Sequence, residues 1–116
     1  MVLLATAAGC ALVRGTPPSA PSATFSATAY SVTGTTAIGM QTRPGIVAAD
    51  PAVLPLGTRI RVSGAGRYSG VYTVADTGRA IRGREIDIFI PDLVAAKRFG
   101  RRRVTVEVLG DRQARR

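Results

Sequence analysis

The chain has 116 residues, of which 46% are hydrophobic and 20% charged, so it can form one small globular domain with short appendages but not two packed domains. Its sixteen Lys and Arg residues against seven Asp and Glu give a formal net charge of +9, which favours anionic surroundings. The single Cys excludes an internal disulfide, and the lack of His excludes catalytic triads and metal sites built on imidazole. Any chemistry must therefore use carboxylates, hydroxyls or backbone groups.

The N-terminus has the pattern of an export signal. Residues 1–13 are small and apolar and end before Arg14, and Ala8-Gly9-Cys10 is similar to a lipobox, which leaves a lipid-modified Cys at the mature N-terminus. The alternative is an apolar N-terminus without a targeting role. Residues 14–24 are rich in Pro and Ser and predict an extended linker. The sequence therefore predicts an exported protein, lipid-anchored through Cys10, whose folded domain covers 25–110 and ends in a basic tail at 111–116.

The rest of the chain has short β-branched runs separated by Gly and Pro, which is typical of strands. Six strands are predicted, over residues 25–32, 46–49, 58–63, 68–75, 85–90 and 103–109. One short helix is predicted over 92–99, because Pro91 and Asp92 suit its first turn and Gly100 its end. A domain this short has too few residues to cover both faces of a sheet with helices. The sequence therefore predicts a mainly β fold that closes into a small barrel.

Three aspartates lie where strands end or turns begin, or within a strand. Asp50 precedes Pro51, which is also the pattern of a turn or helix cap, and Asp76 precedes Thr77-Gly78, which is also the pattern of an Asx turn. Asp87 interrupts an apolar strand. It lies either on a solvated face or in a polar site where burial raises its pKa and makes it a usable general acid.

Several motifs in order along the chain resemble the 3D domain, a family named for three aspartates. They are Thr28-Ala29-Tyr30, the turn at 35–39, the stretch 47–51 leading to 54–58, the loop 76–83 and the strand 86–89. The resemblance runs from about residue 28 to 109 and includes the eleven-residue spacing of Asp76 and Asp87. It implies a six-stranded double-psi β-barrel, related to the C-terminal region of the MltA lytic transglycosylases and to small stationary-phase muralytic enzymes.

The resemblance also implies an activity and its residues. Asp87 takes the position of the catalytic acid, with Asp76 and Asp50 as companion carboxylates. The substrate would be the glycan strand of peptidoglycan, cleaved at the MurNAc–GlcNAc bond in the cell envelope without metal or cofactor. One acid protonates the leaving oxygen and then takes the proton of the muramyl C6 hydroxyl, which closes a 1,6-anhydro ring. We expect Asp76 to hold Asp87 in position and to keep it protonated through like-charge coupling.

Four further residues are candidates for substrate binding: Tyr30, Thr36, Gly78 and Arg82. Tyr30 is either a sugar-stacking ring or a core residue. Arg82 stands where the family commonly has Lys, and Ile38 stands where it has Thr or Ser. We also expect positive φ at four glycines, Gly34, Gly39, Gly78 and Gly83.

Three other functions compete with this interpretation. A related barrel can bind glycan without cleaving it. Asp76-Thr77-Gly78 is the triplet of aspartic proteases, which would require a homodimer. The Arg-rich C-terminal end has the charge for nucleic acid but lacks interleaved aromatics and a recognisable module, so no nucleic-acid partner is predicted.

Overall fold

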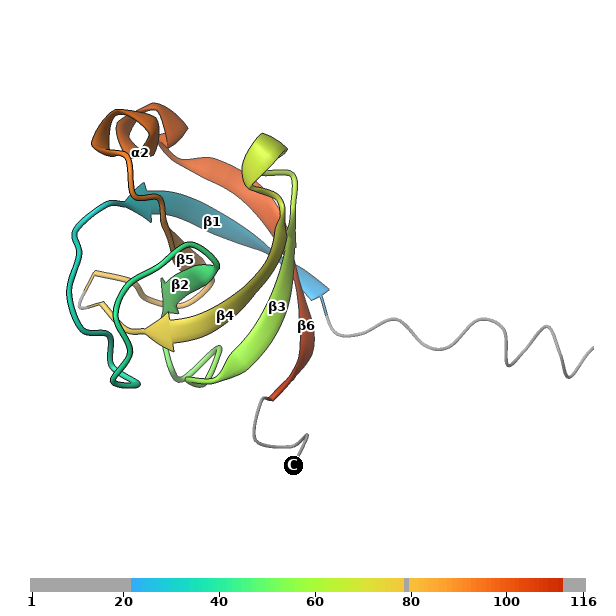
Figure 1. Ribbon diagram of the computed structural model, residues 1–116. Helices are drawn as coiled ribbons and strands as arrows, with labels where there is room; N and C mark the ends of the chain where they lie inside the picture. Colours follow the sequence, from blue (N-terminus) through green and yellow to red (C-terminus); the bar gives the residue numbers. More distant parts are fainter. Residues whose placement is uncertain (1–21, 79, 112–116) are drawn as a thin grey trace, which may run out of the picture.

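Six strands close into a barrel in the order β1-β5-β2-β4-β3-β6 (Figure 1). The computed structural model describes residues 22–78 and 80–111. The elements are β1 (Ser22–Tyr30), β2 (Ile46–Ala49), β3 (Thr58–Ser63), the 3₁₀ turn η1 (Gly66–Tyr68), β4 (Gly70–Asp76), β5 (Glu85–Phe89), α2 (Leu93–Phe99) and β6 (Arg102–Asp111). The predicted fold, a mainly β six-stranded barrel with one short helix, is confirmed.

The barrel is mixed. β1 pairs in parallel with β5, and β2 pairs in parallel with β4, while the other four neighbouring pairs are antiparallel. Parallel neighbours need long connections, so strands far apart in the sequence lie side by side. The loop from β1 to β2 and the loop from β4 to β5, on the left of Figure 1, each join strands that are not neighbours in the barrel.

The first and last strands of the chain, β1 and β6, are longer than the sequence pattern indicated. β1 begins at Ser22, inside the segment expected to be linker, because Ser22 pairs with Glu107 on β6. It ends at Tyr30 and not at residue 32. β6 extends to Asp111, which pairs with Thr58 on β3. Cross-strand hydrogen bonds therefore order Ser- and Gly-containing ends whose own β propensity is low.

The barrel interior is filled by alternate residues of every strand. Its largest fully buried side chains come from β3, β5 and their neighbours and include Ile60, Val62, Ile86 and Ile88. A smaller apolar cluster, Ile46, Ala75 and Phe89, lies separately, with Tyr30 and Met40 packed against it. Since Val47 and Val74 belong to the interior cluster, this second cluster occupies the outer face of the barrel.

Helix α2 lies at one end of the barrel and begins and ends where the sequence predicts. Asp92 is its N-cap and accepts a hydrogen bond from the Ala95 amide at 2.9 Å, while Gly100 leaves the helix with φ of 65°. Phe99 is buried against the interior and meets the Tyr68 ring edge-on, with ring centroids 5.7 Å apart. The helix thus seals the end of the barrel that is uppermost in Figure 1.

The predicted export segment, Cys10 and most of the predicted linker lie outside the described residues. Within the described part of the chain, no helix has the length and apolar character needed to cross a membrane.

Candidate functional site

A row of four residues crosses neighbouring strands on the outer face of the barrel. Thr28 of β1 is in register with Asp87 of β5, and Asp87 is in register with Ala48 of β2. Ala48 is in turn in register with Asp76 of β4. We call Thr28, Asp87, Ala48 and Asp76 the aspartate row. Its two carboxylate residues flank the small Ala48, so two strand spacings separate their Cα atoms, roughly 10 Å.

A β-bulge in β4 brings Asp76 into this row. Ile46 and Val47 of β2 pair with Thr73 and Val74, but the register then shifts and Ala48 pairs with Asp76. Simple alternation from the buried Val74 would turn Asp76 into the barrel interior. The extra residue, Ala75, packs in the outer cluster, and Asp76 is turned to the outer face beside Ala48.

Asp87 is half-buried on this face, while its strand neighbours Ile86 and Ile88 point into the interior. Burial raises the pKa of the Asp87 carboxyl, and the Thr28 hydroxyl opposes this by donating a 2.9 Å hydrogen bond to Oδ1. The environment therefore favours the protonated acid, and the hydroxyl stabilises the carboxylate once the proton has left.

The carboxylate of Asp76 has a different set of partners. Its Oδ1 accepts hydrogen bonds from the backbone amides of Ala37, at 3.0 Å, and Thr77, at 2.9 Å. The Ala75 carbonyl also accepts from the Ile38 amide, so the end of β4 holds the loop between β1 and β2. The hydrogen bond that the structure gives Asp87 comes from Thr28 and not from Asp76, and burial is the main cause of its raised pKa.

Tyr30 lies beside both aspartates at the end of β1. Its ring meets Phe89 edge-on, with centroids 5.4 Å apart. Burial first, and then the charges of Asp76 and Asp87, raise the pKa of the Tyr30 phenol to about 12. The hydroxyl oxygen is buried and has no hydrogen-bond partner in the described part of the chain. Tyr30 therefore packs in the outer cluster through its ring. Its hydroxyl stays protonated because it is buried near two carboxylates.

Asp50 stands in the turn after β2 and holds that turn to the loop before β5. Its Oδ1 accepts from the Ala52 amide at 3.0 Å, and its Oδ2 accepts from the Gly83 amide at 2.8 Å. The Gly83 hydrogen bond, then the Ala52 hydrogen bond and the charge of Arg82 lower the pKa of the Asp50 carboxyl. This geometry keeps Asp50 ionised and supports the structural alternative left open by the sequence.

The three remaining candidate residues lie in loops. Thr36 is buried, and its backbone and hydroxyl both bond to Met40, so it stabilises the β1–β2 loop. The exposed Arg82 donates its backbone amide to Glu85 and lies near Asp50. Gly78 does not have positive φ, so that prediction is wrong, whereas Gly39 and Gly83 do. A Cβ at Gly78 would lie 2.9 Å from the Ile81 side chain, and this close approach is what selects glycine.

The aspartate row is partly covered: Thr28, Asp76 and Asp87 are half-buried and Ala48 is buried. Three surface cavities, of about 350, 240 and 380 Å³, are lined by other parts of the barrel. Among residues 22–78 and 80–111, no three His, Cys, Asp or Glu side chains come together as metal ligands would. What the row offers is the Asp87 carboxyl, whose half-buried environment favours the protonated form and so suits acid–base chemistry.

Residues 45–110 match the 3D domain family, and this stretch includes all three aspartates. The chain belongs to the 3D domain family. The matched stretch also contains Asp76-Thr77-Gly78, the triplet on which the protease alternative rests.

Two proteins of Bacillus subtilis (strain 168) are similar to this chain. The cell wall-binding protein YocH is 39% identical over 95 residues, which cover 74% of this chain and 32% of YocH. The protein YabE is 37% identical over 95 residues, which cover 74% of this chain and 22% of YabE. The chain therefore spans about a third or less of the length of these relatives.

The barrel is also similar to that of MltA from E. coli. One crystal structure of MltA matches with a TM-score of 0.55 and 22% identity, over 67% of this chain and 28% of MltA. A structure of a variant of the same lytic transglycosylase matches with a TM-score of 0.54 and 18% identity, over 66% of this chain and 27% of the variant. These matches confirm the predicted relationship in fold.

Sequence reasoning missed Thr28 as a partner of Asp87. The residue stands in a motif that the family resemblance uses, and alternation along β1 puts it on the same face as Tyr30. Its role depends on the pairing of β1 with β5, which joins residues 59 positions apart. Only the parallel register of these strands identifies it.

Proposed function

We propose that this protein acts on peptidoglycan in the cell envelope and cleaves the MurNAc–GlcNAc bond as a lytic transglycosylase, leaving 1,6-anhydro ends. The observation that carries the proposal is Asp87, a half-buried carboxyl with a raised pKa on the outer face of a barrel whose fold is similar to that of MltA. The similarity to a protein named for cell-wall binding supports the substrate class.

The reaction requires one group that first gives and then takes a proton. Asp87 in its acid form would donate its proton to the glycosidic oxygen as the bond to C1 of the muramyl residue breaks. The resulting carboxylate, stabilised by the Thr28 hydroxyl, would take the proton of the C6 hydroxyl as that oxygen closes on C1. Because the nucleophile belongs to the substrate, the second carboxylate of ordinary glycoside hydrolysis is not required.

The other residues would support this step without exchanging protons. Asp76 holds the β1–β2 loop beside the aspartate row through the Ala37 amide. Tyr30 would support the outer face through its ring, which meets Phe89 edge-on, while its hydroxyl stays buried. Asp50 joins the turn after β2 to the loop before β5 through the Gly83 amide, with the charge of Arg82 nearby.

A barrel that binds glycan without cleaving it is the second candidate. The name of the relative YocH, a cell wall-binding protein, favours binding. Under this alternative Asp87 would accept hydrogen bonds from sugar hydroxyls and would not donate a proton.

The deciding experiment is mass spectrometry of peptidoglycan digested with the purified protein, with Asp87→Asn in parallel. We expect 1,6-anhydro products from the wild type and none from Asp87→Asn. The control is Glu107→Gln, which removes an exposed carboxylate from the ion pair with Arg61 on β3 and should cleave normally. Reducing-end products would indicate hydrolysis, and wall binding without any product would favour the binding barrel.

Export and anchoring through Cys10 belong to the same proposal, because peptidoglycan is extracytoplasmic. Replacement of Cys10 by Ser should release the protein from the membrane fraction of cells that express the full chain. Unchanged fractionation would contradict the lipid anchor and would leave the cleavage proposal intact.

A further inference from the structure

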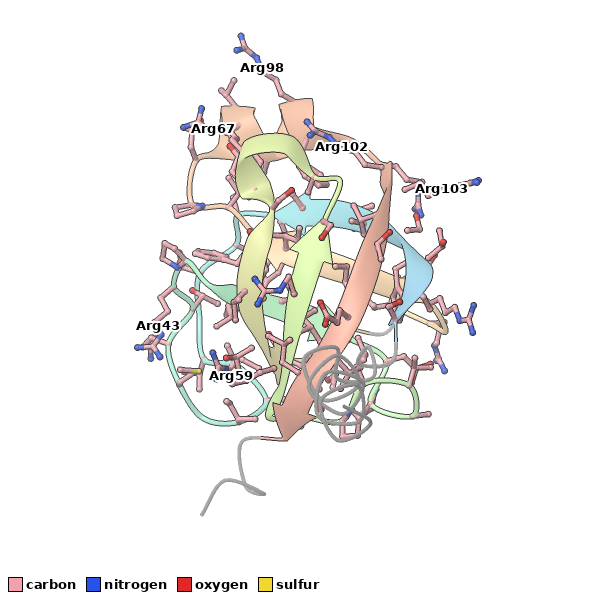
Figure 2. All side chains as sticks on the ribbon, turned by 90° about the vertical axis from the view of Figure 1, so that its right-hand side faces the viewer. Arg43, Arg59, Arg67, Arg98, Arg102 and Arg103 are labelled. Atoms are coloured by element: carbon pink, nitrogen blue, oxygen red, sulfur yellow. The ribbon has the colours of Figure 1, made fainter. Side chains whose placement is uncertain are left out.

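An arginine-lined groove lies at the end of the barrel closed by α2. It has a volume of about 380 Å³, and its charged lining comes from three elements: Arg67 of η1, Arg98 of α2 and Arg102 of β6. Figure 2 shows these three side chains around the uppermost end of the molecule, away from Arg43 and Arg59. Tyr68 and Phe99 supply its aromatic walls. None of its lining residues belongs to the aspartate row.

Arg102 is held in place by the backbone. Its Nε donates to the Phe99 carbonyl at 3.0 Å, its Nη1 donates to the Ala65 carbonyl at 3.3 Å, and its guanidinium lies 4.3 Å from the Phe99 ring centroid. These bonds use two of the five N–H donors of the guanidinium. A fixed cation with spare donors is suited to the planar oxygens of a carboxylate or phosphate.

The cations of the groove are poorly balanced by acidic groups. Asp92 is the one carboxylate in the lining, and its Oδ2 is already used as the N-cap acceptor for Ala95. The ion pairs found among the described residues join Arg61 to Glu107 and Arg101 to Glu85, and none involves Arg67, Arg98 or Arg102. Arg67 and Arg98 are exposed, and Arg67 lies 5.7 Å from the Tyr68 ring centroid. The groove therefore carries a net positive charge that faces solvent.

We propose that this groove binds the oxyanion groups, phosphate or carboxylate, of an acidic wall polymer, as a contact separate from the aspartate row. The inference rests on the cell-wall part of the proposed function and not on cleavage. Three guanidinium groups from three elements match oxygens repeated along a polymer, whereas a neutral glycan offers no charge for them. The groove would hold the protein on the wall while the aspartate row contacts the glycan.

The test is co-sedimentation of the purified full chain with isolated cell walls at about 0.1 M salt, where exposed charges still attract one another. The variant Arg67→Gln/Arg98→Gln leaves the structural Arg102 in place. We expect it to bind about fivefold more weakly than the wild type, as two exposed charge contacts imply. The control, Arg43→Gln/Arg59→Gln, changes the net charge equally at the other end of the barrel and should stay within about twofold of wild type.

Two sources of the oxyanion are distinguished by the wall preparation. If the difference between the two double variants disappears on walls stripped of phosphodiester-linked polymers, the ligand is phosphate; if it persists, the ligand is the carboxylate of the peptidoglycan peptides. Equal weakening by both double variants would overturn the proposal, because net charge alone would explain binding. The proposal would also be overturned if Arg67→Gln/Arg98→Gln bound walls as the wild type does but bound duplex DNA or anionic vesicles more weakly.

Failure of this inference is separable from failure of the proposed cleavage. Arg67→Gln/Arg98→Gln should cleave short soluble glycans at the wild-type rate, because the groove lies apart from the aspartate row. If wall binding depends on the groove arginines but no cleaved product forms, the groove proposal is supported and the transglycosylase proposal is contradicted. If the protein cleaves glycan but the two double variants bind walls equally, the transglycosylase proposal is supported and the groove proposal is contradicted.

Discussion

Asp87 and Asp50 carry the same carboxyl group in two contrasting places. Asp87 lies within β5, half-buried, and receives one hydrogen bond from a side-chain hydroxyl. Asp50 lies in an exposed turn and receives two hydrogen bonds from backbone amides. Burial raises the pKa of Asp87, and the backbone amides lower the pKa of Asp50. The comparison teaches that burial and the number of hydrogen-bond donors around a carboxyl, and not its place in a motif, decide whether it can carry a proton or only hold a turn.

The sharpest test of this contrast is the effect of the same substitution at both sites. Asp87→Asn should lower the rate of glycan cleavage at least about 100-fold, because it removes the general acid. Asp50→Asn should cleave at a rate close to that of the wild type while unfolding at a lower temperature, since one amide partner is lost. The release of soluble glycan fragments and thermal unfolding measure the two effects. Equal loss of cleavage in both variants would break the comparison.

The Thr28 hydrogen bond sets the pH range over which Asp87 can act. Cleavage needs the acid form, so the rate should fall as pH rises through the raised pKa of Asp87. Thr28→Val removes the hydrogen bond that lowers this pKa, so the falling limb should move to higher pH. The pH dependence of the cleavage rate measures this shift, with Thr24→Val on an exposed position of the same strand as the control. If the fall in cleavage rate occurs at the same pH in Thr28→Val, or at lower pH, a group other than Asp87 controls the pH dependence.

The buried hydroxyl of Tyr30 should cost stability. Tyr30→Phe removes an unpartnered polar atom, so the free energy of unfolding should rise by about 1 kcal/mol. Tyr72→Phe is the matched control, because the Tyr72 hydroxyl donates to the Tyr68 carbonyl; its loss should lower the free energy by about 1 kcal/mol. Urea unfolding of both variants measures the difference. A loss of stability in Tyr30→Phe would indicate that this hydroxyl has a stabilising partner.

The smallest effect concerns stability at acid pH. The lowered pKa of Asp50 means that the folded state favours its ionised form, so this contribution is present above the ordinary pKa of 3.8 and is lost as pH falls. Asp87 has the opposite sign: its contribution is present at low pH and is lost as pH rises through its raised pKa. Asp50→Asn should therefore flatten the loss of stability on acidification, and Asp87→Asn should not. Thermal unfolding as a function of pH distinguishes them.

Much of the fold could be predicted because its signals are local. The alternation of Ile86, Asp87 and Ile88 predicts a strand with one face buried, and Asp92 and Gly100 predict the ends of the helix. Strand ends were less predictable. Ser22 is ordered by its partner on β6, and nothing in the residues around it indicates this pairing.

The sequence by itself determined that the chemistry would rest on a few carboxylates, that the chain would form a small β barrel, and that Asp87 would stand in an apolar strand. Only the tertiary structure decided which groups surround them. The bulge at Ala75 turns Asp76 to the outer face, and the parallel pairing of β1 with β5 brings the Thr28 hydroxyl to Asp87. Both depend on register between distant strands, and a shift of one residue in register would reverse the face of every side chain.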